Sequence, residues 1–343
     1  MSAVFLPFIF YLLCLFSVWS WKDESFGDSC PSANYNVGSY DDTKTNEVGR
    51  KKRWAIVCLY SSKKPGKIEK RNELLAKAIQ PFSGLHEFSV VFFSEEMFDA
   101  EAVKGWETTF SGIATVKTID TSGNGYDLPE RYGYKYMCKF FMLDIFSYLR
   151  DHYDYYLRCD TDCFITSLGM DIFKWAEEES IGYGWVIRKM EGHRPTATTL
   201  PKWVANYVER CNISPSAVME YPLSKCFHFY NNFHLGNVKF FFQPEVRKFL
   251  LAINATSYML THRWGDSDLQ AYAVRLFMKS NALRQIPNVE YIHGSHKNRL
   301  VSTFGYGERT NVPHRLPLPE WEKQRISANS SSDVRNSIDS DNF

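Results

Sequence analysis

The stretch Tyr153-Asp-Tyr-Tyr-Leu-Arg-Cys-Asp-Thr-Asp162 decides the fold prediction for this chain. Its aromatic residues favour a half-buried extended strand, and the run ends in two carboxylates, Asp160 and Asp162. Because residues two apart in an extended segment project to the same side, we expect both carboxylates to face one ligand. Two oxygen ligands at the carboxyl end of a strand suit a divalent cation that faces a phosphorylated ligand. The stretch therefore predicts a metal site at the tip of a strand.

The pattern Asp-x-Asp is common, so its context matters more than its presence. It occurs in this chain at positions 160–162, 266–268 and 339–341. The last copy lies in a tail rich in Ser, Asn and Asp, which is typical of solvated linker. Only the first copy follows a run with strand character, and the metal prediction rests on that context.

Short apolar runs alternate with helical patterns on either side of this stretch. Strands that alternate with helices predict an α/β sheet with right-handed crossovers, in which ligands bind at the carboxyl ends of the strands. The expected strands and apolar runs are 54–60, 88–93, 113–119, 183–187 and 238–242, and the expected helices are 67–79, 134–149, 171–179 and 266–278.

The chain divides by composition into four parts. Residues 1–21 carry no charge and are mostly apolar, so they are expected to be a signal peptide or a signal-anchor, and the rest of the chain is expected to enter the secretory pathway. Residues 22–50 are polar and are expected to form a stem or linker. Residues 51–325 are expected to form a single domain, and residues 326–343 a disordered tail.

Cysteines and glycosylation sequons agree with a secretory compartment. Sequons begin at Asn212, Asn254 and Asn329. One of the eight cysteines lies in the leader, which leaves an odd number elsewhere, and the sequence does not determine their pairing. Cys159 and Cys163 flank the acidic pair, but no second pair has the spacing of a zinc site, so we do not expect them to bind metal.

Charge excludes one class of partner. The formal net charge is +1 over 343 residues, whereas a dedicated nucleic-acid-binding protein shows a basic excess on one face. The basic cluster at 51–53 is short and is typical of a linker or a juxtamembrane segment. We therefore expect no nucleic-acid partner, and membrane contact only through the N-terminal segment if it is not cleaved.

Several segments together resemble the fungal-type α-1,2-mannosyltransferases of glycosyltransferase family 15. The resemblance runs from about residue 54 to about residue 296 and is strongest from residue 134 onward. The matching segments, in the order of the family, are Tyr134-Lys-Tyr-Met-Cys-Lys-Phe140, Tyr153-Asp-Tyr-Tyr-Leu-Arg-Cys-Asp-Thr-Asp162, Phe173-Lys-Trp175, His228-Phe-Tyr-Asn-Asn-Phe233 and Arg263-Trp-Gly-Asp266.

The resemblance implies a fold, a reaction and a compartment. The family has the GT-A type nucleotide-sugar-binding fold, with a central, mostly parallel, twisted sheet flanked by helices. Its members use Mn²⁺ and the donor GDP-mannose, so this chain is expected to transfer mannose to a glycan or glycoprotein acceptor. As a type II membrane protein it would act in the Golgi lumen, and the ER lumen or secretion are the alternatives.

The resemblance also suggests the metal ligands. Where the family has Glu-Pro-Asp, this chain has Asp160-Thr-Asp162, which keeps both carboxylates. The resemblance gives Asp162 the metal role, with Asp160 as the carboxylate on the nucleotide side. It suggests His293 as a further metal ligand from later in the sequence, because imidazole is acceptable to Mn²⁺. His296 is the alternative.

Further donor contacts are expected around these ligands. Lys135 and Arg158 are candidate phosphate partners, although helix lysines are often solvated charges. Trp264 is a candidate for stacking on a sugar ring, whose C–H face is apolar, although most aromatic side chains fill the core. The segments that carry the resemblance add Tyr134 and Arg263 to the predicted nucleotide-sugar contacts.

Two departures from the family affect the mechanism. The family's Asn-Phe-Glu is Asn232-Phe-His234 here, and its Glu-Arg-Trp-Gly-Asp begins with His262. A histidine cannot readily form a glycosyl ester or replace the carboxylate that stabilises an oxocarbenium-like centre. We therefore expect front-face attack, in which the departing phosphate accepts the acceptor proton while His234 and Tyr230 line the pocket. Asp266 is the predicted carboxylate of the sugar or acceptor site, with a helix N-cap as its alternative role.

Two other functions remain open at this point. A protein of this fold could bind nucleotide sugars or glycans without turnover, and the change to His234 permits that. A nucleotidyltransferase also uses two acidic ligands on an α/β sheet, but it needs a glycine-rich phosphate loop after the first strand, and residues 61–66 fit that pattern poorly.

Overall fold

The protein is described here from a computed structural model, which places residue 30 and residues 51–60, 65–94, 97–119, 133–214, 223–294 and 299–303. At its centre is a seven-stranded sheet in the order β10-β6-β9-β4-β1-β2-β3. All neighbouring strands are parallel except β9, which runs antiparallel between β4 and β6. The strands are β1 (Arg53–Leu59), β2 (Glu87–Ser94), β3 (Ala114–Thr118), β4 (Tyr155–Cys159), β6 (Tyr183–Trp185), β9 (Phe233–Asn237) and β10 (Leu283–Gln285).

The first four strands coincide with the apolar runs that predicted them. In β1 the side chains alternate between two separate hydrophobic clusters: Ala55 and Val57 face one, and Trp54, Ile56 and Cys58 face the other. A strand that is buried on both faces is a continuous apolar run, as expected for the interior of a parallel sheet.

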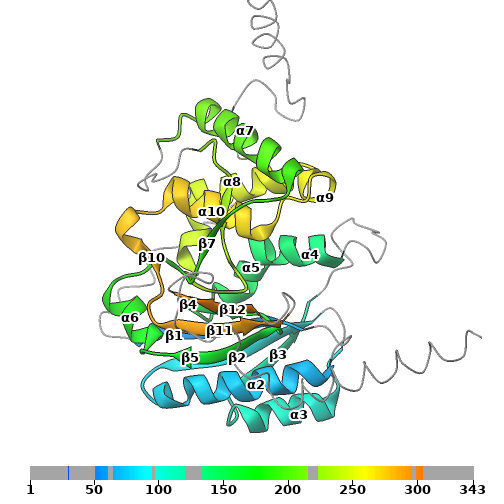
Figure 1. The fold of residues 1–343 in the computed structure, drawn as a ribbon, viewed down its shortest axis with the longest axis vertical. Helices are drawn as coiled ribbons and strands as arrows, with labels where there is room; N and C mark the ends of the chain where they lie inside the picture. Colours follow the sequence, from blue (N-terminus) through cyan, green and yellow to red (C-terminus); the bar gives the residue numbers. More distant parts are fainter. Residues whose placement is uncertain are drawn as a thin grey trace, which may run out of the picture.

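Helices cover both faces of the sheet (Figure 1). On one side lie α2 (Pro65–Ile79) and α3 (Ala100–Thr109), and on the other side lie α4 (Gly133–Lys139), α5 (Ile145–Leu149), α8 (Pro244–Asn254) and α10 (Asp266–Phe277). The arrangement is the predicted α/β architecture of a mostly parallel sheet flanked by helices.

Some elements differ from the sequence prediction. The predicted helix 134–149 is interrupted by a π-helical turn, Phe140–Asp144, between α4 and α5. The apolar run 238–242 contains a buried 3₁₀ turn, Lys239–Phe242. Helix α7 (Arg194–Arg210) was not predicted, because Pro201 inside it and its threonine-rich start obscure the helical pattern. The remaining α-helices of the described residues are α6 (Ile172–Glu178) and the short α9 (Tyr258–Thr261).

Two small sheets bring distant segments to the end of β4. One has the order β12-β11-β5 and consists of β5 (Cys163–Leu168), β11 (Val289–His293) and β12 (Arg299–Ser302). Its register places His293 opposite Cys163. The other pairs β7 (Arg188–Met190) with β8 (Phe227–Phe229).

The structure shows one of the cysteine pairings that the sequence left undetermined. Cys30 is bonded to Cys211 at the end of α7, and Cys58, Cys138, Cys159, Cys163 and Cys226 are buried free thiols. Within the part of the chain that the structure places, no helix is long and apolar enough to cross a membrane. The predicted leader (1–21), the tail (326–343) and the rival ligand His296 lie outside the described residues, as does nearly all of the predicted stem (22–50).

Candidate active site

The chain turns sharply where β4 ends. The strand stops at Cys159, the amide of Asp160 donates to the Asn232 carbonyl at 3.0 Å, and the amide of Cys163 donates to the Asp160 carbonyl at 3.0 Å. This turn ends the extended geometry between Asp160 and Asp162. The extended strand on which the prediction of a shared side depended is therefore absent here, and the two carboxylates have different partners, Arg158 for Asp160 and His293 for Asp162.

The Asp160 carboxylate binds Arg158. The Arg158 Nε and Nη2 atoms donate to the two carboxylate oxygens at 2.6 and 2.9 Å, and Nη1 donates to Asp266 Oδ2 at 2.5 Å. Asn231 Nδ2 donates to the same Asp266 oxygen at 2.6 Å. The Arg158 guanidinium also lies 3.5 Å from the centroid of the Phe141 ring. One arginine therefore pairs with two carboxylates that are 106 positions apart in the chain.

The charges of this network depend on one another. Burial alone would lower the pKa of Arg158, but the adjacent Asp160 and Asp266 raise it above its usual value. Burial raises the pKa of Asp160, and the Arg158 guanidinium opposes that rise. Since a bidentate arginine–carboxylate pair is strong and geometrically specific, the network fixes the end of β4 against the start of α10.

The structure excludes one of the two roles considered for Asp266. Gly265 is the N-cap of α10 and makes no side-chain cap, whereas Asp266 is the first helical residue and is 2% exposed. Its carboxylate accepts from Arg158 and Asn231. The N-cap alternative is therefore wrong, and Arg158, which was expected at the phosphates, lies buried between carboxylates.

A second arginine supports the same turn from the other side of the sheet. Arg71 in α2 is completely buried, and its guanidinium donates to the Cys159 carbonyl and, at 3.4 Å, to the Asp160 carbonyl. No sequence pattern distinguishes Arg71, because an arginine in an amphipathic helix is usually solvated. Its burial shows that it holds the backbone from which Asp160 and Asp162 project.

Asp162 lies beside His293, the metal ligand that the family resemblance suggested from the C-terminal part of the chain. His293 Nε2 is 3.1 Å from Asp162 Oδ2, and His293 Nδ1 is hydrogen-bonded to the Tyr230 hydroxyl. The Lys189 ammonium lies 4.7 Å from the centroid of the Tyr230 ring. Gly294, which follows His293, donates its amide to the Asp162 carbonyl at 2.8 Å. Antiparallel pairing of β11 with β5 thus joins two ligand types that are 131 positions apart.

These residues fit a divalent cation as a two-residue site. A carboxylate oxygen and an imidazole nitrogen 3.1 Å apart match adjacent ligand positions around Mn²⁺, for which both ligand types are suitable. For Nε2 to bind the ion, Nδ1 carries the proton and donates to the Tyr230 hydroxyl oxygen, which is the outer hydrogen bond that metal-binding histidines usually make. Asp160 is turned toward Arg158, so Asp162 and His293 would hold the ion together with oxygen atoms of a bound diphosphate.

His234 occupies the interior instead of a pocket wall. It is 1% exposed, its Nδ1 lies 2.7 Å from the Asn231 carbonyl, and its Nε2 lies 3.0 Å from the Tyr156 hydroxyl. Since a carbonyl only accepts, Nδ1 carries the proton and Nε2 accepts from Tyr156. Burial, followed by the nearby Arg158 charge, lowers the pKa of His234 to about 3. The expectation that His234 lines the pocket is therefore wrong, because the neutral ring is enclosed.

The Arg-Trp-Gly-Asp segment has a mainly structural arrangement. Arg263 has a positive φ of 56°, and its guanidinium lies 5.4 Å from the centroid of the exposed Tyr134 ring. Trp264 is 1% exposed, and its Nε1 donates to Thr199 Oγ1 at 2.9 Å. A ring with no free face cannot stack on a sugar, so the stacking expectation for Trp264 is wrong. Arg263 and Tyr134 remain accessible, as nucleotide-sugar contacts require.

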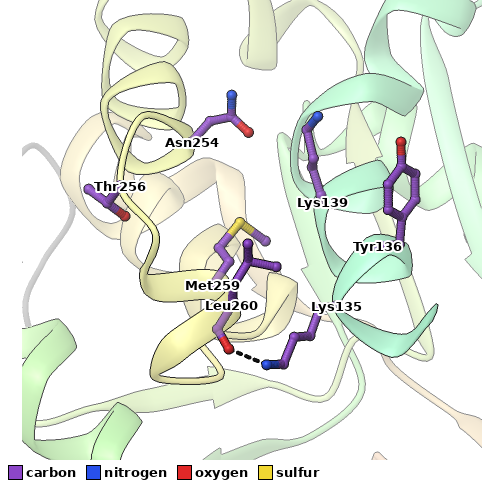
Figure 2. A pocket seen from close by; sticks show the side chains of 7 residues that line it. All are labelled: Lys135, Tyr136, Lys139, Asn254, Thr256, Met259 and Leu260. Carbon is purple, nitrogen blue, oxygen red and sulfur yellow. Dashed lines mark hydrogen bonds between the residues drawn. The ribbon is translucent and has the colours of Figure 1, made fainter. Parts of the chain in front are cut away.

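Lys135 faces a small pocket between helices (Figure 2). Its ammonium group donates to the Leu260 carbonyl at one end of that pocket. None of the lining residues belongs to the Arg158 network or to the Asp162–His293 pair. The pocket is lined by Lys135, Tyr136 and Lys139 of α4, by Asn254 at the end of α8, and by Thr256, Met259 and Leu260.

A mostly parallel sheet flanked by helices, with an acidic turn at the tip of a central strand, is the GT-A arrangement of glycosyltransferases. The family model described as glycolipid 2-alpha-mannosyltransferase matches residues 114–304. The chain belongs to this family.

Curated relatives and a solved structure agree with that assignment. The probable mannosyltransferase MNT3 of Candida albicans is 25% identical over 166 residues, covering 47% of this chain and 44% of the relative. Glycolipid 2-alpha-mannosyltransferase 2 of the same organism is 28% identical over 173 residues, covering 47% and 37%. The chain thus spans less than half the length of these relatives. In fold it is similar to core-mannan synthase A (CmsA/Ktr4) from Aspergillus fumigatus in its Mn/GDP form, with a TM-score of 0.62, 16% identity, and coverage of 72% of this chain and 76% of that one.

Proposed function

We propose that this chain is a divalent-cation-dependent mannosyltransferase that uses GDP-mannose and transfers the sugar to a glycan or glycoprotein acceptor. The observation that carries the proposal is the Asp162–His293 pair, with 3.1 Å between oxygen and nitrogen, beside the acidic turn at the end of β4. Family membership supports the sugar, and the Mn/GDP form of the similar solved structure supports the cation and the nucleotide.

Different residues of the chain have different roles in donor binding. Asp162 and His293 would hold Mn²⁺, which when bound neutralises charge on the diphosphate leaving group. Tyr230 orients His293 through its hydrogen bond. Arg158 keeps Asp160 and Asp266 in fixed positions, and Arg71 holds the backbone of the same turn. The accessible Tyr134 and Arg263 contact the nucleotide sugar.

The step at the sugar has no carboxylate from position 234. His234 is buried, neutral and hydrogen-bonded on both ring nitrogens, so it neither attacks the anomeric carbon nor accepts the acceptor proton. Front-face attack meets the requirement: the acceptor oxygen bonds to the anomeric carbon as the bond to the GDP oxygen breaks, and the departing phosphate oxygen takes the acceptor proton. Positioning of donor and acceptor then supplies much of the rate.

Release of GDP tests this function. The purified full-length chain is incubated with GDP-mannose and a mannoside acceptor in the presence of Mn²⁺ or EDTA. We expect acceptor-dependent GDP release with Mn²⁺, none with EDTA, and a loss of about 100-fold or more in Asp162→Ala. Asp151→Ala is the control, because Asp151 is 73% exposed and lies away from the turn. Equal release by Asp162→Ala and the unmodified chain would refute the metal assignment.

The enclosed His234 favours a second candidate, a nucleotide-sugar-binding protein without turnover. Such a protein would keep the Asp162–His293 pair and bind GDP only with Mn²⁺, but would release no GDP from GDP-mannose with any acceptor. Calorimetry of GDP binding beside the release assay separates the two functions. Binding without release supports this candidate, and release supports the transferase.

We propose the lumen of the secretory pathway, most simply the Golgi, as the compartment. The disulfide between Cys30 and Cys211 supports this proposal, because such bonds persist mainly in oxidising compartments. Microscopy of the full-length chain carrying a C-terminal tag, with protease protection, tests it.

A further inference from the structure

Three side chains from different elements meet beside the β7–β8 pair. Glu191 follows β7, His228 lies in the middle of β8, and Asp268 belongs to the first turn of α10. Backbone pairing sets Lys189 opposite His228, and the amide of Glu191 donates to the Cys226 carbonyl at 3.1 Å. Asp268 is 2% exposed, and the side chains of Glu191 and His228 are 15% exposed. This cluster shares no residue with the Asp162–His293 pair.

The donor atoms of this cluster converge without forming good hydrogen bonds. One ligand atom from each side chain lies within 4.8 Å of the other two. His228 Nδ1 is 3.5 Å from Glu191 Oε2 and 3.4 Å from Asp268 Oδ1. The same nitrogen is buried and has no hydrogen-bond partner. An imidazole nitrogen thus faces two carboxylate oxygens at distances and angles that do not satisfy it.

The spacing suits a metal ion. Ligands about 2.0–2.2 Å from a tetrahedral Zn²⁺ lie about 3.4 Å from one another, and both measured separations agree with that value. Two carboxylates this close also repel unless a positive charge, from a metal ion or from a protonated His228, lies between them. We propose that Glu191, His228 and Asp268 form a second metal site, which takes Zn²⁺ or a similar transition-metal ion.

The surroundings complete the site in the manner of known zinc centres. The other oxygen of Glu191 accepts from the His193 amide, and such hydrogen bonds commonly fix the orientation of a metal-binding carboxylate. Three protein ligands leave a fourth position for water. The Cys226 thiol lies 3.8 Å from Asp268 Oδ1 and borders the cluster. A bound ion would tie the β7–β8 pair to the start of α10.

Zinc binding to the full-length chain tests the site. The protein is stripped with EDTA, dialysed, and titrated with Zn²⁺ by calorimetry, in the Asp162→Ala background so that the Asp162–His293 pair contributes no binding. We expect about one Zn²⁺ per chain, and at least about a 100-fold loss of affinity when Asp268→Asn or His228→Ala is added. His152→Ala and Asp151→Asn are the controls, since both residues are exposed.

X-ray absorption at the zinc edge on the otherwise unmodified Asp162→Ala chain removes the dependence on buried substitutions. We expect a first shell with one imidazole nitrogen and carboxylate oxygens. Absence of zinc binding in Asp162→Ala, or a shell without imidazole, would overturn the proposal and leave His228 as a protonated partner of the two carboxylates. Neither result bears on GDP release, so the transferase function stands or fails separately.

Discussion

The buried His234 should make the stability of this protein fall on mild acidification. The unfolded chain binds a proton at this histidine below a pKa of about 6.5, whereas the folded protein does not until its pKa of about 3 is reached. Between these values the unfolded state binds more protons, so the free energy of unfolding decreases as the pH falls from 6.5 toward 3.

The structure gives the size of the effect. At pH 5 the proton taken up by the unfolded histidine lowers the free energy of unfolding by about 2 kcal/mol relative to pH 7. The folded ring cannot accept that proton without loss, because Nδ1 already donates to the Asn231 carbonyl and Nε2 accepts from Tyr156. Other titrating groups act in the same range, so the comparison must isolate this side chain.

Urea unfolding at pH 7, 6 and 5 provides the assay, comparing the unmodified chain with His234→Gln. The glutamine variant will be less stable at pH 7, but its stability should fall by about 2 kcal/mol less between pH 7 and pH 5. His152→Gln, at an exposed position, should leave the slope unchanged. A slope in His234→Gln equal to that of the unmodified chain would refute the assignment of a buried, neutral histidine.

Three further perturbations test other parts of the fold. Arg158→Met leaves Asp160 and Asp266 without their shared cation and should lower the free energy of unfolding in urea at pH 7 by about 3–5 kcal/mol; a change as small as that in the exposed-site variant Lys174→Met would contradict the network. Cys211→Ser opens the bond to Cys30 and should lower the thermal midpoint, at a cost of about 2–5 kcal/mol; reductant should then have no further effect on the variant. Gly236→Ala would place a Cβ atom 2.6 Å from Tyr156 and should cost about 1–3 kcal/mol by urea unfolding, whereas Gly192→Ala, with open space around it, should cost less than 1 kcal/mol; equal costs would count against the close packing.

Much of the central sheet was predictable, because its strands are local patterns. A strand buried on both faces, such as β1, is a continuous apolar run in the sequence. Two features that the sequence did not predict, helix α7 and the π-helical turn, have identifiable causes. Pro201 lies inside α7, and the π-helical turn Phe140–Asp144 depends on packing within a helix whose pattern looks regular.

The site was predictable only in part, because it depends on contacts between distant segments. The resemblance to family 15 suggested Asp162 and His293, and the structure brings them together. No local pattern indicates that Arg158 is buried between Asp160 and Asp266, or that Arg71 reaches the backbone across the sheet. The turn after Cys159 likewise gives Asp160 and Asp162 different partners, which an extended strand would not predict. Which neighbour a charged side chain meets is decided by tertiary structure.

Asp266 and Asp268 stand in the same first turn of α10, yet one contacts Arg158 and the other faces His228. Any displacement of that turn moves both aspartates at once. If a ligand at either neighbourhood displaced this turn, the affinity at the other would change, and thermodynamic linkage requires that influence to be equal in both directions.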